Sequence, residues 1–196
     1  CRFCQAGFYY RPIRERSVDT LVRQACELMD NTGYDELGLL SLSTSDYSQL
    51  KELVDKIKVE ADKRKVKVAL PSLRLDSFEA EIYDGIQGAS LTFAPEAGTQ
   101  RLRDVINKNI NEEDILTSLT TAMKYGVKNV KLYFIIGLPT EREEDLQGIV
   151  DIVHLIKKLH AQCGTSKLLN ITVSTSVFIP KPLTPFQWES QITIEQ

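Results

Sequence analysis

The chain has 196 residues, 42% of them hydrophobic, and a formal net charge of −3. This length suits one domain with a real core, or a large part of a larger domain, and the acidic balance argues against general nucleic-acid binding. No apolar run approaches the ~20 residues of a membrane span, and four cysteines do not form a disulfide framework, so we expect a cytoplasmic protein without a membrane segment.

Helical and strand-like periods alternate along the chain. Apolar residues at helical spacing predict helices over 18–29, 47–64, 75–83, 99–106, 111–125 and 143–160. Ser17 is the expected N-cap of the first helix and Gly33 its stop. Short apolar runs predict strands over 37–42, 66–71, 89–94, 130–136 and 171–179. Strands separated by helices imply a parallel sheet with right-handed crossovers.

The predicted strands have two chemically different faces. One face is apolar and includes Leu40, Leu42, Leu91, Phe93, Leu132, Phe134, Ile136, Ile171, Val173 and Val177. The alternate positions are small or polar and include Ser41, Ser43, Ser90, Thr92, Glu96, Lys131, Tyr133, Thr172, Ser174 and Ser176. A doubly wound sheet would have two apolar faces, whereas a polar inner face suits a barrel with a ligand-holding lumen. We therefore predict an α/β fold with an incomplete parallel β/α barrel, whose missing first strand precedes Cys1.

Two cysteines, Cys1 and Cys4, stand in a loop before the first predicted helix. Their spacing fits half a zinc site, a redox dithiol or half an iron–sulfur site. The other candidate ligands fall on helices or in a distant connection: Cys26, His154, His160 and Cys163. A zinc knuckle is therefore disfavoured, and no thioredoxin pattern follows the pair. Thiolates are soft ligands that suit iron–sulfur clusters.

The segment Cys1-Arg2-Phe3-Cys4 resembles the last two cysteines of the Cys-x3-Cys-x-aromatic-Cys motif of the radical S-adenosylmethionine (SAM) superfamily. In that family the motif follows the first strand of a partial barrel and holds a 4Fe–4S cluster. The first cysteine of the motif, expected four residues before Cys1, is absent. The resemblance therefore implies that residues 1–196 are the core domain of a longer protein, cut within the cluster loop. Cys1 and Cys4 are the expected metal ligands, and Phe3 would shield the cluster and SAM.

The resemblance places the adenine of SAM at the ends of the last two strands. Gly137-Leu138-Pro139 resembles the family's Gly-x-Pro segment near the adenine, and Phe178-Ile179 resembles the edge that packs on it. Gly137, Pro139, Phe178 and Ile179 are thus expected cofactor-binding residues. Gly137 and Pro139 also fit a simple turn from strand to helix.

Four polar residues complete the SAM site that the resemblance implies. Ser43 and Ser45 stand where many members receive the SAM amino group, although the Gly-Gly-Glu signature of those members is missing. Glu96 stands where the family places a polar residue against the ribose, and Lys131 would meet the SAM carboxylate. Each has an alternative: Glu96 would also favour the next helix through its dipole, and Lys131 would also pair with Glu96.

The resemblance implies reductive cleavage of SAM. An electron from the cluster would yield methionine and a 5′-deoxyadenosyl radical, which would take hydrogen from an unknown substrate. An electron donor such as flavodoxin or ferredoxin would supply the cluster. Segments 8–17 and 179–188 look most like an uncharacterised branch with an upstream cobalamin-binding-like segment, which adds cobalamin as a candidate cofactor.

Two other classes of function stay open on the sequence. Lys131, pointing inward on a barrel strand, would suit a Schiff-base aldolase, which leaves the cysteine pair unexplained. Cys1 and Cys4 would suit a non-catalytic metal-binding or partner-binding module. Nucleic acid also stays open as a partner, because Arg11, Arg14 and Arg16 could meet phosphate, although no stacking aromatic pattern supports an RNA module.

Overall fold

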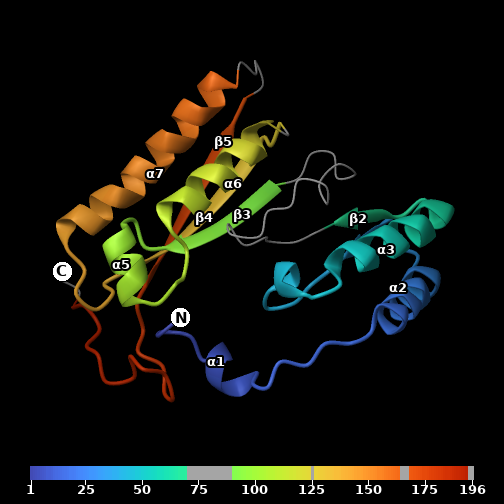
Figure 1. Cartoon of the computed structure of the whole chain (residues 1–196), viewed down its shortest axis with the longest axis horizontal. Coiled ribbons are helices and arrows are strands. Elements are labelled where there is room, and N and C mark those ends of the chain that lie inside the picture. Colours follow the sequence, from blue (N-terminus) through green and yellow to red (C-terminus); the bar gives the residue numbers. More distant parts are fainter. Residues whose placement is uncertain (70–89, 125, 164–167, 194–196) are drawn as a thin grey trace.

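The computed structural model describes residues 1–69, 90–124, 126–163 and 168–193. Within these ranges the strands are all parallel and form two sheets (Figure 1). The first sheet pairs β1 (Glu36–Gly38) with β2 (Lys67–Ala69), and the second has the order β3 (Ser90–Glu96), β4 (Asn129–Ile136), β5 (Asn170–Val177). The predicted helix over 75–83 lies outside the described residues. The prediction of an α/β fold with an incomplete parallel barrel is confirmed.

Five of the predicted helices are present in the described ranges, and a short helix at residues 6–9 was not predicted. They are α1 (Ala6–Tyr9), α2 (Val18–Thr32), α3 (Leu50–Arg64), α5 (Gln100–Val105), α6 (Glu112–Lys124) and α7 (Glu143–Gln162), with a short 3-10 helix η1 (Thr44–Asp46). The Ser17 side chain accepts a hydrogen bond from the Thr20 amide at 3.4 Å, and Gly33 ends α2 in the left-handed region. The Thr99 side chain caps α5 in the same way.

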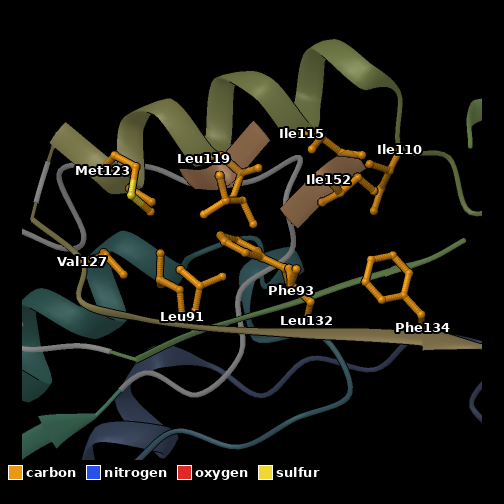
Figure 2. Packing of buried hydrophobic residues seen from close by; sticks show 13 residues of the cluster. Leu91, Phe93, Ile110, Ile115, Leu119, Met123, Val127, Leu132, Phe134 and Ile152 are labelled. Carbon is orange, nitrogen blue, oxygen red and sulfur yellow. The ribbon is translucent and has the colours of Figure 1, made fainter. Parts of the chain in front are cut away.

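The larger core lies between the three-stranded sheet and the helices α6 and α7 (Figure 2). Alternate residues of β3 and β4 point to these helices: Leu91, Phe93, Val130, Leu132 and Phe134. They pack on Ile115, Leu119 and Met123 of α6 and on Ile152 and Ile156 of α7. The predicted apolar face of these two strands is therefore confirmed as the face that helices cover.

A second core lies between α2, α3 and the two-stranded sheet. Its buried members are Val18, Ala25, Met29, Leu53, Ile57 and Ala61, with Leu37, Val66 and Val68 packed against them. The predicted strand over 37–42 is wrong in its extent, because β1 ends at Gly38. Leu40 and Leu42 lie beyond it and are exposed, so their predicted place on the apolar face is also wrong.

The other face of the three-stranded sheet carries polar side chains. Thr92, Lys131 and Thr172 share one row, and Tyr133 lies beside Ser174 in the next row. At the amino-terminal ends of β4 and β5, the side chain of Asn170 donates a hydrogen bond to the side chain of Asn129 at 3.0 Å. Val173 and Val177 of the edge strand are half-exposed, so the apolar face is incomplete on β5. In the described ranges, no helix is long and apolar enough to cross a membrane.

Candidate functional site

The carboxyl ends of β3, β4 and β5 meet at one edge of the sheet, and the cysteine loop lies against this edge. The Arg2 amide donates a hydrogen bond to the Ile106 carbonyl at 2.8 Å, after α5. The Phe186 amide donates to the Arg2 carbonyl at 3.3 Å, from the segment after β5. These two main-chain bonds tie the loop to the segments that follow β3 and β5. Ligands of parallel α/β folds bind at such edges.

An apolar cluster joins the loop to this edge. Its buried members are Ala97, Leu102, Ile106, Leu138, Phe178 and Phe186, and Phe3 packs on them. The rings of Phe178 and Phe186 meet edge to face, with centroids 6.1 Å apart. The structure thus brings Phe3, the turn after β4 and Phe178 together, while Ile179, the next residue, is exposed.

Cys1 and Cys4 stand at the two ends of one turn. The Cys4 amide donates to the Cys1 carbonyl at 3.2 Å, and the Cys4 Sγ accepts a hydrogen bond from the Ala6 amide at 3.4 Å. Both thiols are free. Two thiols on one turn and an amide aimed at sulfur fit an iron–sulfur cluster, whose potential such bonds tune. Among the described residues, no three Cys, His, Asp or Glu side chains gather as a metal site.

The turn after β4 is held by a carboxylate that the sequence analysis did not single out. Gly137 has φ +73°, in the region that favours glycine, and its amide donates to Glu141 Oε2 at 2.7 Å. The Glu141 amide in turn donates to the Leu138 carbonyl at 3.0 Å. Burial raises the pKa of the Glu141 carboxyl, although the amides of Gly137 and Leu138 oppose this shift. The Gly-x3-Glu spacing was the available signal for this residue.

Glu96 ends β3 and faces a cation, but that cation is Lys108. The backbone φ of Glu96 is +66°, which is uncommon for a residue with a side chain. Lys108 Nζ lies 3.1 Å from Glu96 Oε1, and both side chains are only 16% exposed. The predicted alternative of a Glu96–Lys131 pair is therefore wrong. Lys108 comes from the loop after α5, where no local pattern marks it.

Lys131 lies far from the carboxyl ends of the strands. It is the third residue of β4 and stands five positions before Ile136, which is about 16 Å along a strand. Its side chain is exposed on the polar face, between Thr92 and Thr172. Glu96 and Gly137 thus stand at the carboxyl ends of β3 and β4, whereas Lys131 stands near the amino end of β4.

Ser43 and Ser45 follow the other sheet. Ser43 stands at the start of η1, and its hydroxyl donates to Asp46 Oδ2 at 2.6 Å. Ser45 lies within η1. The roles of both serines toward SAM stay predictions.

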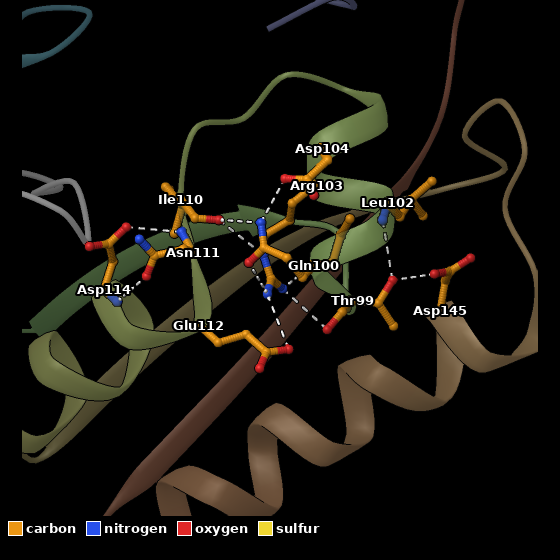
Figure 3. A network of polar contacts seen from close by, with 12 residues as sticks. Thr99, Gln100, Leu102, Arg103, Asp104, Ile110, Asn111, Glu112, Asp114 and Asp145 are labelled. Carbon is orange, nitrogen blue, oxygen red and sulfur yellow. Dashed lines mark hydrogen bonds and ion pairs between the residues drawn. The ribbon is translucent and has the colours of Figure 1, made fainter.

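A buried polar network fixes the turn between Glu96 and α5 (Figure 3). The guanidinium of Arg103 is fully buried and donates to the carbonyls of Ala97, Gly98 and Ile110. Asp145 of α7 accepts hydrogen bonds from Thr99 and Arg101. Burial alone would raise the pKa of Asp145, but these bonds outweigh it and hold the pKa below its usual range.

Comparison with known proteins agrees with this arrangement. Residues 1–153 match the family model of the radical SAM superfamily. An uncharacterised protein of Methanocaldococcus jannaschii is 35% identical over 189 residues, which cover 96% of this chain and 40% of that protein. The cytidylyl-2-hydroxyethylphosphonate methyltransferase of Streptomyces wedmorensis is 29% identical over 77% of this chain and 30% of its own length. The solved coproporphyrinogen III oxidase of Escherichia coli, a radical SAM enzyme, has a TM-score of 0.62 at 12% identity, covering 91% of this chain and 42% of its own.

The fold and the site edge define a partial β/α barrel with its ligand edge at the strand ends. The chain belongs to the radical SAM superfamily, since the family model matches most of its length. It spans about two fifths of the length of the Methanocaldococcus relative. The comparisons give no support to the cobalamin-associated branch, which stays a prediction.

Proposed function

We propose that the chain forms the SAM-binding core of a radical SAM enzyme. The observation that carries the proposal is the attachment of the cysteine turn to the segments that follow β3 and β5, with Phe3 packed on the apolar cluster at the ends of β3, β4 and β5. Cys1 and Cys4 would hold a 4Fe–4S cluster together with a third cysteine expected upstream. When bound, the cluster supplies the electron that cleaves SAM, and the protein orients SAM and excludes water.

Different residues of this edge would contact different parts of SAM. Phe3 and Phe178 provide an apolar wall next to the cysteine turn. The Gly137–Pro139 turn, fixed by Glu141, would present its main-chain groups to the adenine, with Ile179 exposed beside it. Glu96 would meet the ribose with the oxygen that Lys108 leaves available, and Ser43 and Ser45 would meet the amino group from the other sheet.

Lys131 suits a role toward the substrate rather than toward SAM. It lies in the middle of a polar face that carries Thr92, Tyr133 and Thr172. A cation between hydroxyls favours a ligand that bears a carboxylate or a phosphate. We therefore assign Lys131 to the substrate side of the proposed enzyme.

Anaerobic reconstitution tests the proposed cluster. Residues 1–196 alone should bind no stable cluster, because two thiolates cannot fill three ligand positions. A longer form with the third cysteine should bind about four iron atoms per chain and form 5′-deoxyadenosine from SAM under dithionite.

Single cysteine variants of the longer form supply the matched control. Cys4→Ser should lose the iron, whereas Cys163→Ser should keep it, because Cys163 packs against the large core behind the sheet. Stoichiometric cluster in residues 1–196, or equal iron loss in both variants, would overturn the proposal.

A further inference from the structure

One arginine side chain bridges the two turns that the proposed function assigns to the adenosine part of SAM. Glu96 begins the first turn, after β3, and Gly137 begins the second, after β4. Arg101, in the first turn of α5, donates to the carbonyl of Thr140 at 2.9 Å and to the hydroxyl of Thr140 at 3.3 Å. Thr140 follows Pro139 directly, so the Arg101 side chain connects the helix after the first turn to the end of the second turn.

A buried carboxylate holds this arginine in place. Asp145 is only 2% exposed, and its Oδ2 accepts hydrogen bonds from the Arg101 guanidinium and from the Arg142 amide. The other oxygen of Asp145 accepts a hydrogen bond from the hydroxyl of Thr99, the N-cap of α5. A buried charge is costly unless it is paired and hydrogen-bonded, and Asp145 meets both conditions. The carboxylate therefore fixes the guanidinium that reaches the turn after β4.

The pairing of β3 with β4 does not fix the spacing of the two turns by itself. Phe93 pairs with Leu132. Glu96, three residues later, pairs with Phe134, which is only two residues later on β4. A bulge of this kind interrupts the ladder of hydrogen bonds and bends the strand. The place of Glu96 relative to the turn after β4 therefore depends on contacts outside the ladder, and the Arg101 bridge is such a contact.

We propose that Arg101 and Asp145 are positioning residues for SAM, which set the distance between the turn that meets the ribose and the turn that meets the adenine. This inference rests on the proposed function. Ribose and adenine are joined by one bond, so the two turns must keep a fixed spacing to contact both groups. A planar guanidinium suits a bridge between a carbonyl and a carboxylate, whereas a lysine ammonium lacks the fork that such a bridge uses.

Arg101→Lys tests the bridge while it keeps the charge. The Arg101 side chain is 36% exposed, so the variant should fold. The reconstituted full-length protein is titrated by calorimetry with S-adenosylhomocysteine, which is not cleaved, and with methionine, which lacks the adenosine part. Affinity for S-adenosylhomocysteine should fall by at least about fivefold, whereas affinity for methionine should stay within about twofold of wild type. With dithionite, the KM for SAM should rise by a similar factor and kcat for 5′-deoxyadenosine should change little, as for a lost binding interaction.

Arg64→Lys is the matched control. Arg64 of α3 donates to both carboxylate oxygens of Asp30 in α2, at 2.7 and 3.1 Å, so it also bridges two elements. This variant should leave both affinities unchanged, and thermal melting compares the stability of the two variants. An Arg101→Lys protein with lowered melting temperature but unchanged affinity for S-adenosylhomocysteine would overturn the positioning role. Equal loss of affinity for both ligands would also overturn it. Failure of the wild-type protein to form 5′-deoxyadenosine with dithionite would instead overturn the proposed function.

Discussion

The side chain of Glu141 is partly buried, and this burial disfavours its ionised form. It accepts the Gly137 amide at the end of β4, and its pKa is raised above the usual range. A raised carboxyl pKa means that the folded state prefers the protonated form. The stability that this preference gives is complete below the unfolded pKa of about 4.3 and is lost as pH rises through the folded pKa. At neutral pH, ionisation of the partly buried Glu141 therefore lowers the free energy of unfolding.

Glu141→Gln should raise the free energy of unfolding at pH 7. The amide oxygen of glutamine still accepts from Gly137, while the partly buried charge is gone. The difference from wild type should vanish below about pH 4, where Glu141 is protonated in both states. Denaturant unfolding at pH 4 and pH 7 measures it.

Glu143→Gln is the control for this change, because Glu143 is exposed in the first turn of α7. Loss of its charge should lower stability by about 0.3–1 kcal/mol through the helix dipole. A Glu141→Gln protein that is less stable than wild type at pH 7 would show that the charge itself holds the turn.

Single residues were predictable where a local pattern marks them. Gly137 and Phe178 follow strands with clear alternation, so the sequence places them at the strand ends. Lys108 was not predictable, because its partner Glu96 is twelve residues away across a helix and a loop. Lys131 was misplaced because alternation shows which face of the sheet a side chain is on, but not how far that residue lies from the carboxyl end of the strand.

The distance of Lys131 from the carboxyl end of β4 leads to a prediction about SAM binding. Lys131→Met should leave SAM affinity of the full-length protein within about twofold of wild type, since its Cα lies about 16 Å along the strand from Ile136. Calorimetry with SAM measures this, with thermal melting as the check on folding. Weakening by tenfold or more, with unchanged melting, would restore Lys131 to the SAM carboxylate.

At the scale of elements, two glycines set the distance between α7 and the turn after β3. A Cβ built on Gly98 would clash with the Ile149 amide of α7, and one on Gly148 would approach the Gly98 carbonyl oxygen at 2.8 Å. These neighbours are main-chain atoms, so no side chain can move aside. The contact lets α7 approach closely enough for Asp145 to reach Thr99 and Arg101.

Gly98→Ala should destabilise the protein by at least about 1–3 kcal/mol, the usual cost of overpacking. The matched control is Gly38→Ala, because a Cβ there meets no atom within 4 Å. Thermal or urea unfolding of both variants compares them. Equal midpoints for Gly98→Ala and wild type would show that α7 can shift away without loss.

Helices were more predictable than strands, for a physical reason. A helix such as α2 is specified locally by its apolar period, its Ser17 cap and its Gly33 stop. A strand exists only where a partner pairs with it. The apolar run 37–42 shows this, because pairing with β2 ends at Gly38.

At the scale of the whole molecule, the order of parallel strands predicted where the site lies. Alternation along β3 and β4 also predicted which face the helices cover. The division into two sheets was not predictable, because it depends on pairing between segments far apart in sequence. In the described ranges, no hydrogen-bonded ladder joins β2 to β3.

The main-chain attachment of the cysteine turn has a consequence for how this family can diverge. The turn is anchored through the amide and carbonyl of Arg2, which every amino acid except proline also offers. These two main-chain bonds survive any replacement except proline, whereas the bond that the Arg2 guanidinium donates to the Val105 carbonyl at 2.7 Å is lost with the side chain. Selection can reshape the surface around the turn, and hence the partners it meets, without disturbing the chemistry that the turn supports.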